Sequence, residues 1–423
     1  MGWVAGLHAQ AAANAHTGYD PWAGTSRTAR LPMQPPSPTV RAIAALSLTQ
    51  LIGWGSTFWL PAVTGPAMAA DLGLPLPLVM AGPTAMLVVM ALVSWPLGAV
   101  FERHGARPVM VLGSLLGAVG LVLVGLAQGP VSYLLAWTLL GLAGAGMLTT
   151  PAQIAVTEIA GDQARKALGV LILAGGLTST LFWPLTGLLQ AQWGWRAATL
   201  SFGVLMLLVC MPMHWAILAR RPRQKAAESS NAGPAPTIDH PRFVLLAMTF
   251  ASNGFVTWGF ALTIIILFEA AGLSHASALA AASFIGIAQW AGRLFDFLGG
   301  GRWSGFTSGL AASALFPLSF IVLLQTSSFT GALLFAVLYG VAGGVIAVNR
   351  ATLPLQIFPA GAYARASARL AMPLNLSFAA APPAFAALMG SAGPRAALWL
   401  AFGISLLSLA SLFGLWRLQR STG

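Results

Sequence analysis

The sequence predicts an all-α membrane protein with twelve transmembrane helices arranged as two six-helix repeats. Three observations lead to this prediction. First, only 7% of the 423 residues are charged, 57% are hydrophobic and the mean hydropathy is +0.80, whereas soluble domains carry about 25% charged residues. Second, apolar runs of similar length recur along the chain. Third, several residues of the first half recur in the second half at a constant offset of 199.

Each apolar run is long enough to cross a bilayer, which takes about 20 residues. Helix is the expected element, because an open strand would leave backbone groups unpaired in lipid. The predicted spans are 43–68, 77–100, 108–127, 132–157, 167–190, 196–218, 243–269, 277–299, 305–325, 330–356, 367–389 and 396–416.

Composition divides the chain into four segments. Residues 1–41 are rich in Ala, Gly, Pro and Ser, and we expect a disordered cytoplasmic tail. Residues 42–219 form the predicted N-terminal six-helix bundle, and residues 243–418 the C-terminal one. Between them, residues 220–242 are basic and then rich in proline, which predicts a cytoplasmic linker.

The basic residues predict the orientation in the membrane. Most of the 21 lysines and arginines fall in the tails and in loops on the side of the N-terminus, whereas only Arg196 and Arg395 fall in loops on the other side. This bias predicts a multi-pass protein of the cell inner membrane with both termini in the cytoplasm. The net charge of +12 does not indicate nucleic acid as a partner, because the cations lie singly or in small groups between apolar runs.

The repeat aligns the first helix of each half, the fourth and the sixth. Gly55 and Trp59 recur as Gly254 and Trp258. Further pairs at the same offset are Gly73 with Gly272, Gly141 with Gly340, Gly144 with Gly343, Pro184 with Pro383, and Gly194-x-Arg196 with Gly393-x-Arg395. Such parallel halves are typical of one large transporter architecture.

The turn after the second span carries a motif. It reads Gly98-Ala-Val-Phe-Glu102-Arg103-His-Gly-Ala-Arg107 and resembles the loop signature of the major facilitator superfamily. Glu102 stands where Asp is usual, and the second half keeps only Arg302 of this motif. The resemblance covers residues 42–418 and implies the major facilitator fold, a monomer, and transport by alternating access. By the same resemblance, Glu102, Arg103 and Arg107 are expected to form a cytoplasmic gate. Alternatively, they act only as signals for the orientation of the chain in the membrane.

Three short segments resemble the monocarboxylate-porter branch and its bacterial relatives. They are Gly53-Trp54-Gly55, Gly292-Arg293 and Thr352-Leu-Pro-Leu355. This resemblance implies that the arginine of the eighth span binds a substrate carboxylate. The branch often has an acid one turn earlier, and Gln289 occupies that position here, which leaves proton coupling open.

Arg293 is the strongest candidate for substrate binding. A charge at this depth costs a few kcal/mol, so it is expected to face the interior with a partner. Its forked donors suit a carboxylate, although an intrahelical pair with Asp296 is the alternative. Asp296 in turn is a candidate for carrying a coupling proton, or for a counter-ion alone. Arg350, in the tenth span, would favour a dicarboxylate or a phosphorylated substrate, unless it belongs to a cytoplasmic gate.

Uncharged polar and aromatic residues complete the predicted binding site, although each aromatic alone is more often packing. These candidates are Gln50, Trp54, Asn253, Gln289 and Asn349, with Trp258 and Asn375 as further lining.

Several motifs are missing from the sequence. It has no phosphate-cradling loop, no Cys/His cluster and no nucleophile elbow, so neither an enzyme nor a cofactor is predicted. We expect a secondary active transporter, such as a symporter, of a small organic anion. The expected partners are a small-molecule substrate, a proton and membrane lipid, with no nucleic acid. The alternatives are an exporter of apolar or drug-like compounds, and a transporter-like sensor that binds its ligand without flux.

Overall fold

A computed structural model of the chain describes residues 37–218, 238–260, 263–299 and 304–421. The described residues from Thr39 onward form one compact unit. The predicted tail lies outside the described residues as far as position 36. Of the predicted linker, residues 220–237 also lie outside the described residues.

Helices account for every predicted span. In the first half they are α2 (Pro38–Ser56), α3 (Leu60–Leu72), α4 (Leu76–His104), α5 (Ala106–Gly125), α6 (Pro130–Met147), α7 (Thr149–Ala160), α8 (Ala164–Gly175), α9 (Thr178–Leu205), the π-helix Met206–Cys210 and α10 (Met211–Ile217). In the second half they are α12 (His240–Gly259), α13 (Ile264–Ala270), α14 (His275–Gly299), α15 (Gly305–Gln325), α16 (Phe329–Ile357), α17 (Ala360–Ala392) and α18 (Pro394–Arg420).

The predicted fold class is confirmed. Eight helical segments of the described chain are long and apolar enough to cross a membrane, or nine if the bent pair of α12 and α13 is one span. One of the eight, Pro130–Ile217, contains three predicted spans joined by tight turns. The one remaining predicted span coincides with α2 and α3.

The repeat extends to the backbone of the turns. Gly73 and Gly272 have φ values of 62° and 99°, and Gly194 and Gly393 have φ values of 78° and 83°. All four lie in the region that L side chains rarely adopt, which explains why glycine recurs there. Glycines with positive φ therefore occupy equivalent turns in the two halves.

Glycines bring α14 and α16 into close contact. A Cβ on Gly292 would lie 2.5 Å from the carbonyl oxygen of Val341, and one on Gly340 would lie 2.5 Å from Cβ of Ala288. At Gly344 a Cβ would overlap the carbonyl oxygen of Gln289. Small residues at such positions let helix backbones approach closely within a membrane. This contact sets where the side chains of α14 lie relative to those of α16.

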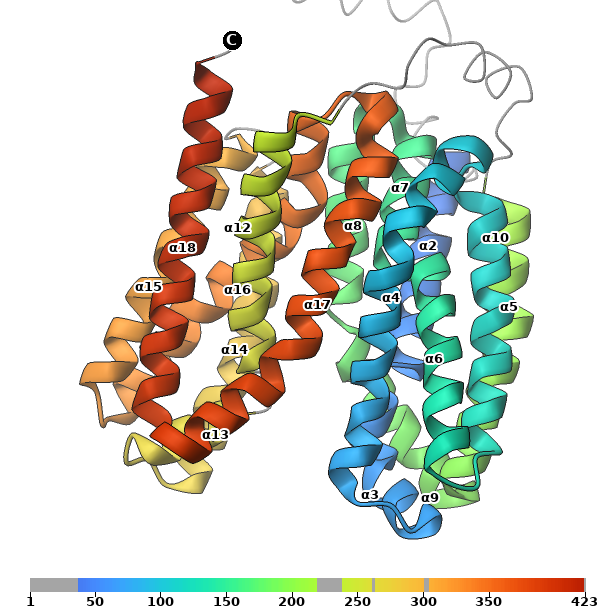
Figure 1. The fold of residues 1–423 in the computed structure, drawn as a ribbon, viewed down its shortest axis with the longest axis horizontal. Helices are drawn as coiled ribbons and strands as arrows, with labels where there is room; N and C mark the ends of the chain where they lie inside the picture. The colour runs from blue at the N-terminus through green and yellow to red at the C-terminus, as the bar shows by residue number, and fades with distance from the viewer. Residues whose placement is uncertain (1–36, 219–237, 261–262, 300–303, 422–423) are drawn as a thin grey trace, which may run out of the picture. The chain divides into compact units, whose positions relative to one another are not determined.

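The two halves meet along α4 and α17, which lie side by side (Figure 1). A Cβ on Gly98 would lie 3.2 Å from Cα of Arg365. One turn further along α4, Glu102 forms an ion pair with Arg365 of α17. Buried apolar residues of both halves surround this contact, including Phe101 and Tyr363. At this end, α4 and α17 are joined by packing and by charge.

Polar contacts hold the first half together at both ends. His214 of α10 lies with Nε2 2.9 Å from Thr49 Oγ1 and with Nδ1 2.8 Å from Ser114 Oγ, and so links α10 to α2 and α5. At the opposite end, Arg196 Nε donates to Asp71 Oδ2 at 2.8 Å, and its Nη1 donates to two carbonyls at the end of α5.

Candidate functional site

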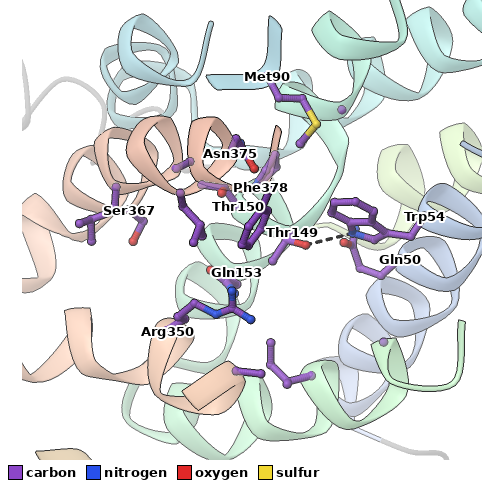
Figure 2. Close-up of a pocket in the computed structure, with 18 of the residues that line it drawn as sticks. Gln50, Trp54, Met90, Thr149, Thr150, Gln153, Arg350, Ser367, Asn375 and Phe378 are labelled. Atoms are coloured by element: carbon purple, nitrogen blue, oxygen red, sulfur yellow. Dashed lines mark hydrogen bonds between the residues drawn. The ribbon is translucent and has the colours of Figure 1, made fainter. Parts of the chain in front are cut away.

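A cavity of about 250 Å³ lies between the two halves (Figure 2). Side chains from α2, α4 and α6 to α9 line it on one side, and side chains from α12, α14, α16 and α17 on the other. Its volume is slightly below the range of about 300–1,000 Å³ that is usual for ligand pockets. The cavity therefore suits a small solute.

Two arginines contribute positive charge to the cavity. Arg293 reaches it from α14 and Arg350 from α16. They are close enough for their charges to repel one another. No aspartate or glutamate is among the described residues that line the cavity. The cavity therefore carries an excess of positive charge.

Each guanidinium is positioned by its surroundings. Arg293 Nε is buried and has no hydrogen-bond partner in the described structure. A Cβ at Gly176 would overlap Arg293 Nη1, so the guanidinium lies against the backbone between α8 and α9. The guanidinium of Arg350 lies 5.5 Å from the ring centroid of Phe378, within the range of a cation–π interaction. Neither group forms an ion pair with a described carboxylate, and the pair of Arg293 with Asp296, which the sequence left as the alternative, is not formed.

Gln50 and Trp54 line the cavity, and both also donate to the fourth span. Gln50 Nε2 donates to the carbonyl of Met147 at 2.9 Å. Trp54 Nε1 donates to Thr149 Oγ1 at 3.0 Å (Figure 2). Both acceptors flank Leu148, where α6 ends and α7 begins. These side chains therefore fix the break in the fourth span as well as forming part of the wall.

Aromatic rings from both halves meet at the cavity wall, which Trp258 and Phe378 help to form. The rings of Phe58 and Trp258 lie 4.7 Å apart and at 71°. Trp258 stacks on Phe378 at 4.5 Å. Phe58 belongs to the first half, whereas Trp258 and Phe378 belong to the second. We call these three residues the aromatic layer.

Three of the predicted substrate-binding residues are not among those that line the cavity. Asn349 is fully buried, and its amide lies 3.4 to 3.5 Å from Ser308 Oγ of α15. Gln289 packs against the glycines of α16. Asn253 is buried within α12.

Asp296 is 6% exposed and does not line the cavity either, and its Oδ1 has no hydrogen-bond partner in the described structure. The three predicted gate residues have different surroundings. Glu102 pairs with Arg365 across the halves. Arg103 is exposed, and the guanidinium of Arg107 lies 5.6 Å from the ring centroid of Trp215 in the same half.

Sequence reasoning missed several polar residues of the cavity wall, among them Thr149, Thr150, Gln153, Ser94, Thr178 and Ser367. Pro151 was the signal for the first two, because a proline inside a helical run ends or kinks the helix. Trp258 and Asn375, which the sequence suggested as further lining, are both part of the wall. No group of three or more His, Cys, Asp or Glu that could hold a metal ion occurs in the described parts of the chain.

Comparison with known proteins shows similarity to transporters. The family model described as "Major Facilitator Superfamily" matches residues 46–334, more than half of the chain. The Fujikurins efflux protein of Gibberella fujikuroi is 26% identical over 276 residues, which cover 62% of this chain and 57% of that protein. Monocarboxylate transporter 4 of Rattus norvegicus is 28% identical over 168 residues, or 39% of this chain and 34% of that protein. The chain therefore matches 57% of the length of the first of these two relatives and 34% of the length of the second.

A solved structure shows the same fold. The crystal structure of the human organic anion transporter MFSD10 (TETRAN) aligns with a TM-score of 0.71 at 18% identity. The alignment covers 90% of this chain and all of that one.

Proposed function

Because the chain belongs to the Major Facilitator Superfamily, we propose that it is a secondary active transporter of a small organic anion, such as a carboxylate. In this proposal the two halves rock about the cavity and expose it alternately to the two sides of the membrane. With the positive-inside bias, the contact of α4 with α17 lies on the cytoplasmic side of an inner membrane and the aromatic layer on the outer side.

The unbalanced charge of the cavity carries this proposal. Arg293 and Arg350 line it, and no described carboxylate lines it or pairs with either of them. An uncompensated charge at bilayer depth costs a few kcal/mol or more. A bound anion would offset that cost, whereas a cationic solute would increase it. Arg293 is the proposed anchor, because a guanidinium gives a carboxylate two parallel hydrogen bonds.

The neighbouring acid supports proton coupling as part of the proposal. Asp296 lies on α14 three residues after Arg293, is buried, and has an oxygen without a hydrogen-bond partner in the described structure. An aspartate in this position can bind a proton on one side of the membrane and release it on the other. Proton uptake recorded with a pH-sensitive dye during anion entry into liposomes tests this role. Coupling that persists unchanged in Asp296→Asn would remove the role from Asp296.

Anion uptake by reconstituted liposomes tests the proposed function. We expect Arg293→Ala to reduce uptake about ten- to a hundredfold, because hydrogen bonds to charged groups contribute about 1.5–3 kcal/mol. Arg293→Lys keeps the charge without the fork and should retain part of the activity. Arg420→Ala is the matched control, because this arginine lies over Trp416 at the end of α18, away from the cavity. Normal uptake by a well-folded Arg293→Ala protein would refute the anchor.

Export of apolar compounds is the second candidate, and the aromatic layer favours it. Trp258 and Phe378 give the cavity flat apolar surfaces, and some similar proteins are named as efflux or multidrug resistance proteins. Growth of expressing cells on toxic apolar compounds separates the two functions. Protection that is unaffected by Arg293→Ala would favour export.

A further inference from the structure

The fourth span is broken inside the cavity. Between α6 and α7, Leu148 has φ −84° and ψ −145°, which is not helical. Pro151 explains the break, because proline has no N–H to offer the carbonyl of residue 147 and its ring collides with that carbonyl. The freed carbonyl of Met147 accepts its hydrogen bond from Gln50 instead. A polar side chain of another helix thus stabilises the break.

The break leaves the N-terminus of α7 open toward the cavity. This twelve-residue helix has no side-chain cap, and its first backbone bond runs from Ala152 N to Leu148 O. In the described structure, no acceptor is found for the N–H groups of Thr149 and Thr150, and both residues line the cavity. Thr149 Oγ1 accepts a hydrogen bond from Trp54 (Figure 2), so its own proton can be donated to a ligand. Uncapped N–H groups at a helix N-terminus, together with the helix dipole, favour anions.

The arginines give an independent indication of an anionic ligand. The Nε atom of Arg293 is buried and has no hydrogen-bond partner in the described structure, and Arg293 lines the same cavity from the other half. Arg350, which is half-buried, adds a second guanidinium on that side. Positive potential therefore comes from both walls.

The internal repeat relates the two walls. At the offset of 199, Thr150-Pro151 corresponds to Asn349-Arg350. In the second half the helix α16 continues unbroken through this position and carries a guanidinium. In the first half the proline breaks the helix and exposes its N-terminus. Equivalent positions thus supply positive charge by two different means.

From these observations we propose that the N-terminus of α7, with Thr149 and Thr150, is a second anion-binding subsite. The substrate is then an organic dianion with two separated anionic groups, a dicarboxylate being the simplest case. One group binds to Arg293 and Arg350, and the other binds at the N-terminus of α7. Trp54 and Gln50 act as positioning residues for this subsite. This proposal rests on the proposed function of organic anion transport.

The subsite is tested by comparing pairs of ligands that differ in one carboxylate. Butyrate and succinate have the same number of carbons, and both are fully ionised at pH 7.5. We expect the purified protein to bind succinate about tenfold more tightly than butyrate, as measured by calorimetry. In Thr150→Asp a fixed carboxylate occupies the subsite, so the preference for succinate should vanish while butyrate still binds. Thr150→Asn is of similar size and carries no charge, so it should reduce the preference less than Thr150→Asp does.

A second variant guards against a folding defect. An acidic residue in the first turn of a helix is favourable, so Thr150→Asp is expected to fold. Pro151→Ala restores the missing N–H and lets the fourth span continue as α16 does, so it too should lose the preference for succinate. A preference that survives in both variants would overturn the subsite, as would an equal loss of both ligands in Thr150→Asp.

The outcomes for the unmodified protein separate the two proposals. If no organic anion binds, the proposed function itself fails. If butyrate binds and succinate binds no more tightly, anion transport stands and the second subsite is refuted.

Discussion

Gly344 of α16 is the position where the close contact between α14 and α16 can be tested directly. A Cβ there would overlap the carbonyl oxygen of Gln289, and would lie 2.9 Å from its carbonyl carbon and 3.0 Å from the backbone nitrogen of Arg293. All three are backbone atoms, so no side chain can rotate away. Gly344→Ala therefore forces α14 to move as a unit. The displaced segment includes the proposed anchor.

The expected cost follows from two opposing effects. Overfilling a well-packed contact costs about 1–3 kcal/mol, whereas alanine in place of glycine within a helix gains about 0.5–1 kcal/mol. We expect a net destabilisation of about 1–2 kcal/mol, seen as a lower apparent melting temperature in detergent. Anion uptake should fall as well, because Arg293 moves with its backbone.

Gly286 provides the matched control on α14. A Cβ there would meet nothing within 4 Å, so Gly286→Ala should leave stability unchanged or raise it by the helix-propensity gain. If Gly344→Ala is as stable and as active as Gly286→Ala, the close contact does not position α14, and the reasoning is wrong.

Two further predictions concern ion pairs. Glu102 and Arg365 have side chains that are 17% and 27% exposed, so Glu102→Gln should weaken the contact of α4 with α17 by about 1–3 kcal/mol. In Glu102→Gln, single cysteines introduced at that end should be labelled faster. The charge exchange Glu102→Arg with Arg365→Glu should restore protection from labelling. Unchanged labelling in Glu102→Gln would show that the pair contributes nothing to closure. Asp71 and Arg196 are more exposed, at 47% and 37%, so Asp71→Asn should cost only about 0.5–1 kcal/mol. Thermal unfolding measures this loss, and a loss above about 3 kcal/mol would exceed what the pair with Arg196 and the hydrogen bond from Trp195 Nε1 to the same oxygen can contribute.

The spans and the repeat could be predicted because lipid imposes local requirements on the sequence. A crossing needs a continuous apolar run whatever its neighbours are, and the glycines of the turns recur because their backbone conformation recurs. The cavity wall depends instead on how each helix is rotated against its neighbours. Asn349 and Arg350 are adjacent in sequence, yet the first faces Ser308 of α15 and the second faces the cavity.

A spacing of one turn was also insufficient to identify the wall. Gln289 and Arg293 lie one turn apart on α14, but only Arg293 lines the cavity, since Gln289 packs against the glycines of α16. Gln50 and Trp54 were predicted as lining and do line it. Their hydrogen bonds to the broken fourth span could not be predicted, because they join residues 97 and 95 positions apart.

The break at Leu148 has a consequence for how this cavity can change over generations. The open end of α7 consists of peptide N–H groups, which almost any residue other than proline supplies equally well. A guanidinium, by contrast, disappears with a single codon change. Mutations, whether natural or introduced by design, should therefore readily remove the positive charge of the wall formed by α14 and α16. The opposite wall would keep its polarity through most substitutions and lose it chiefly when Pro151 itself is replaced.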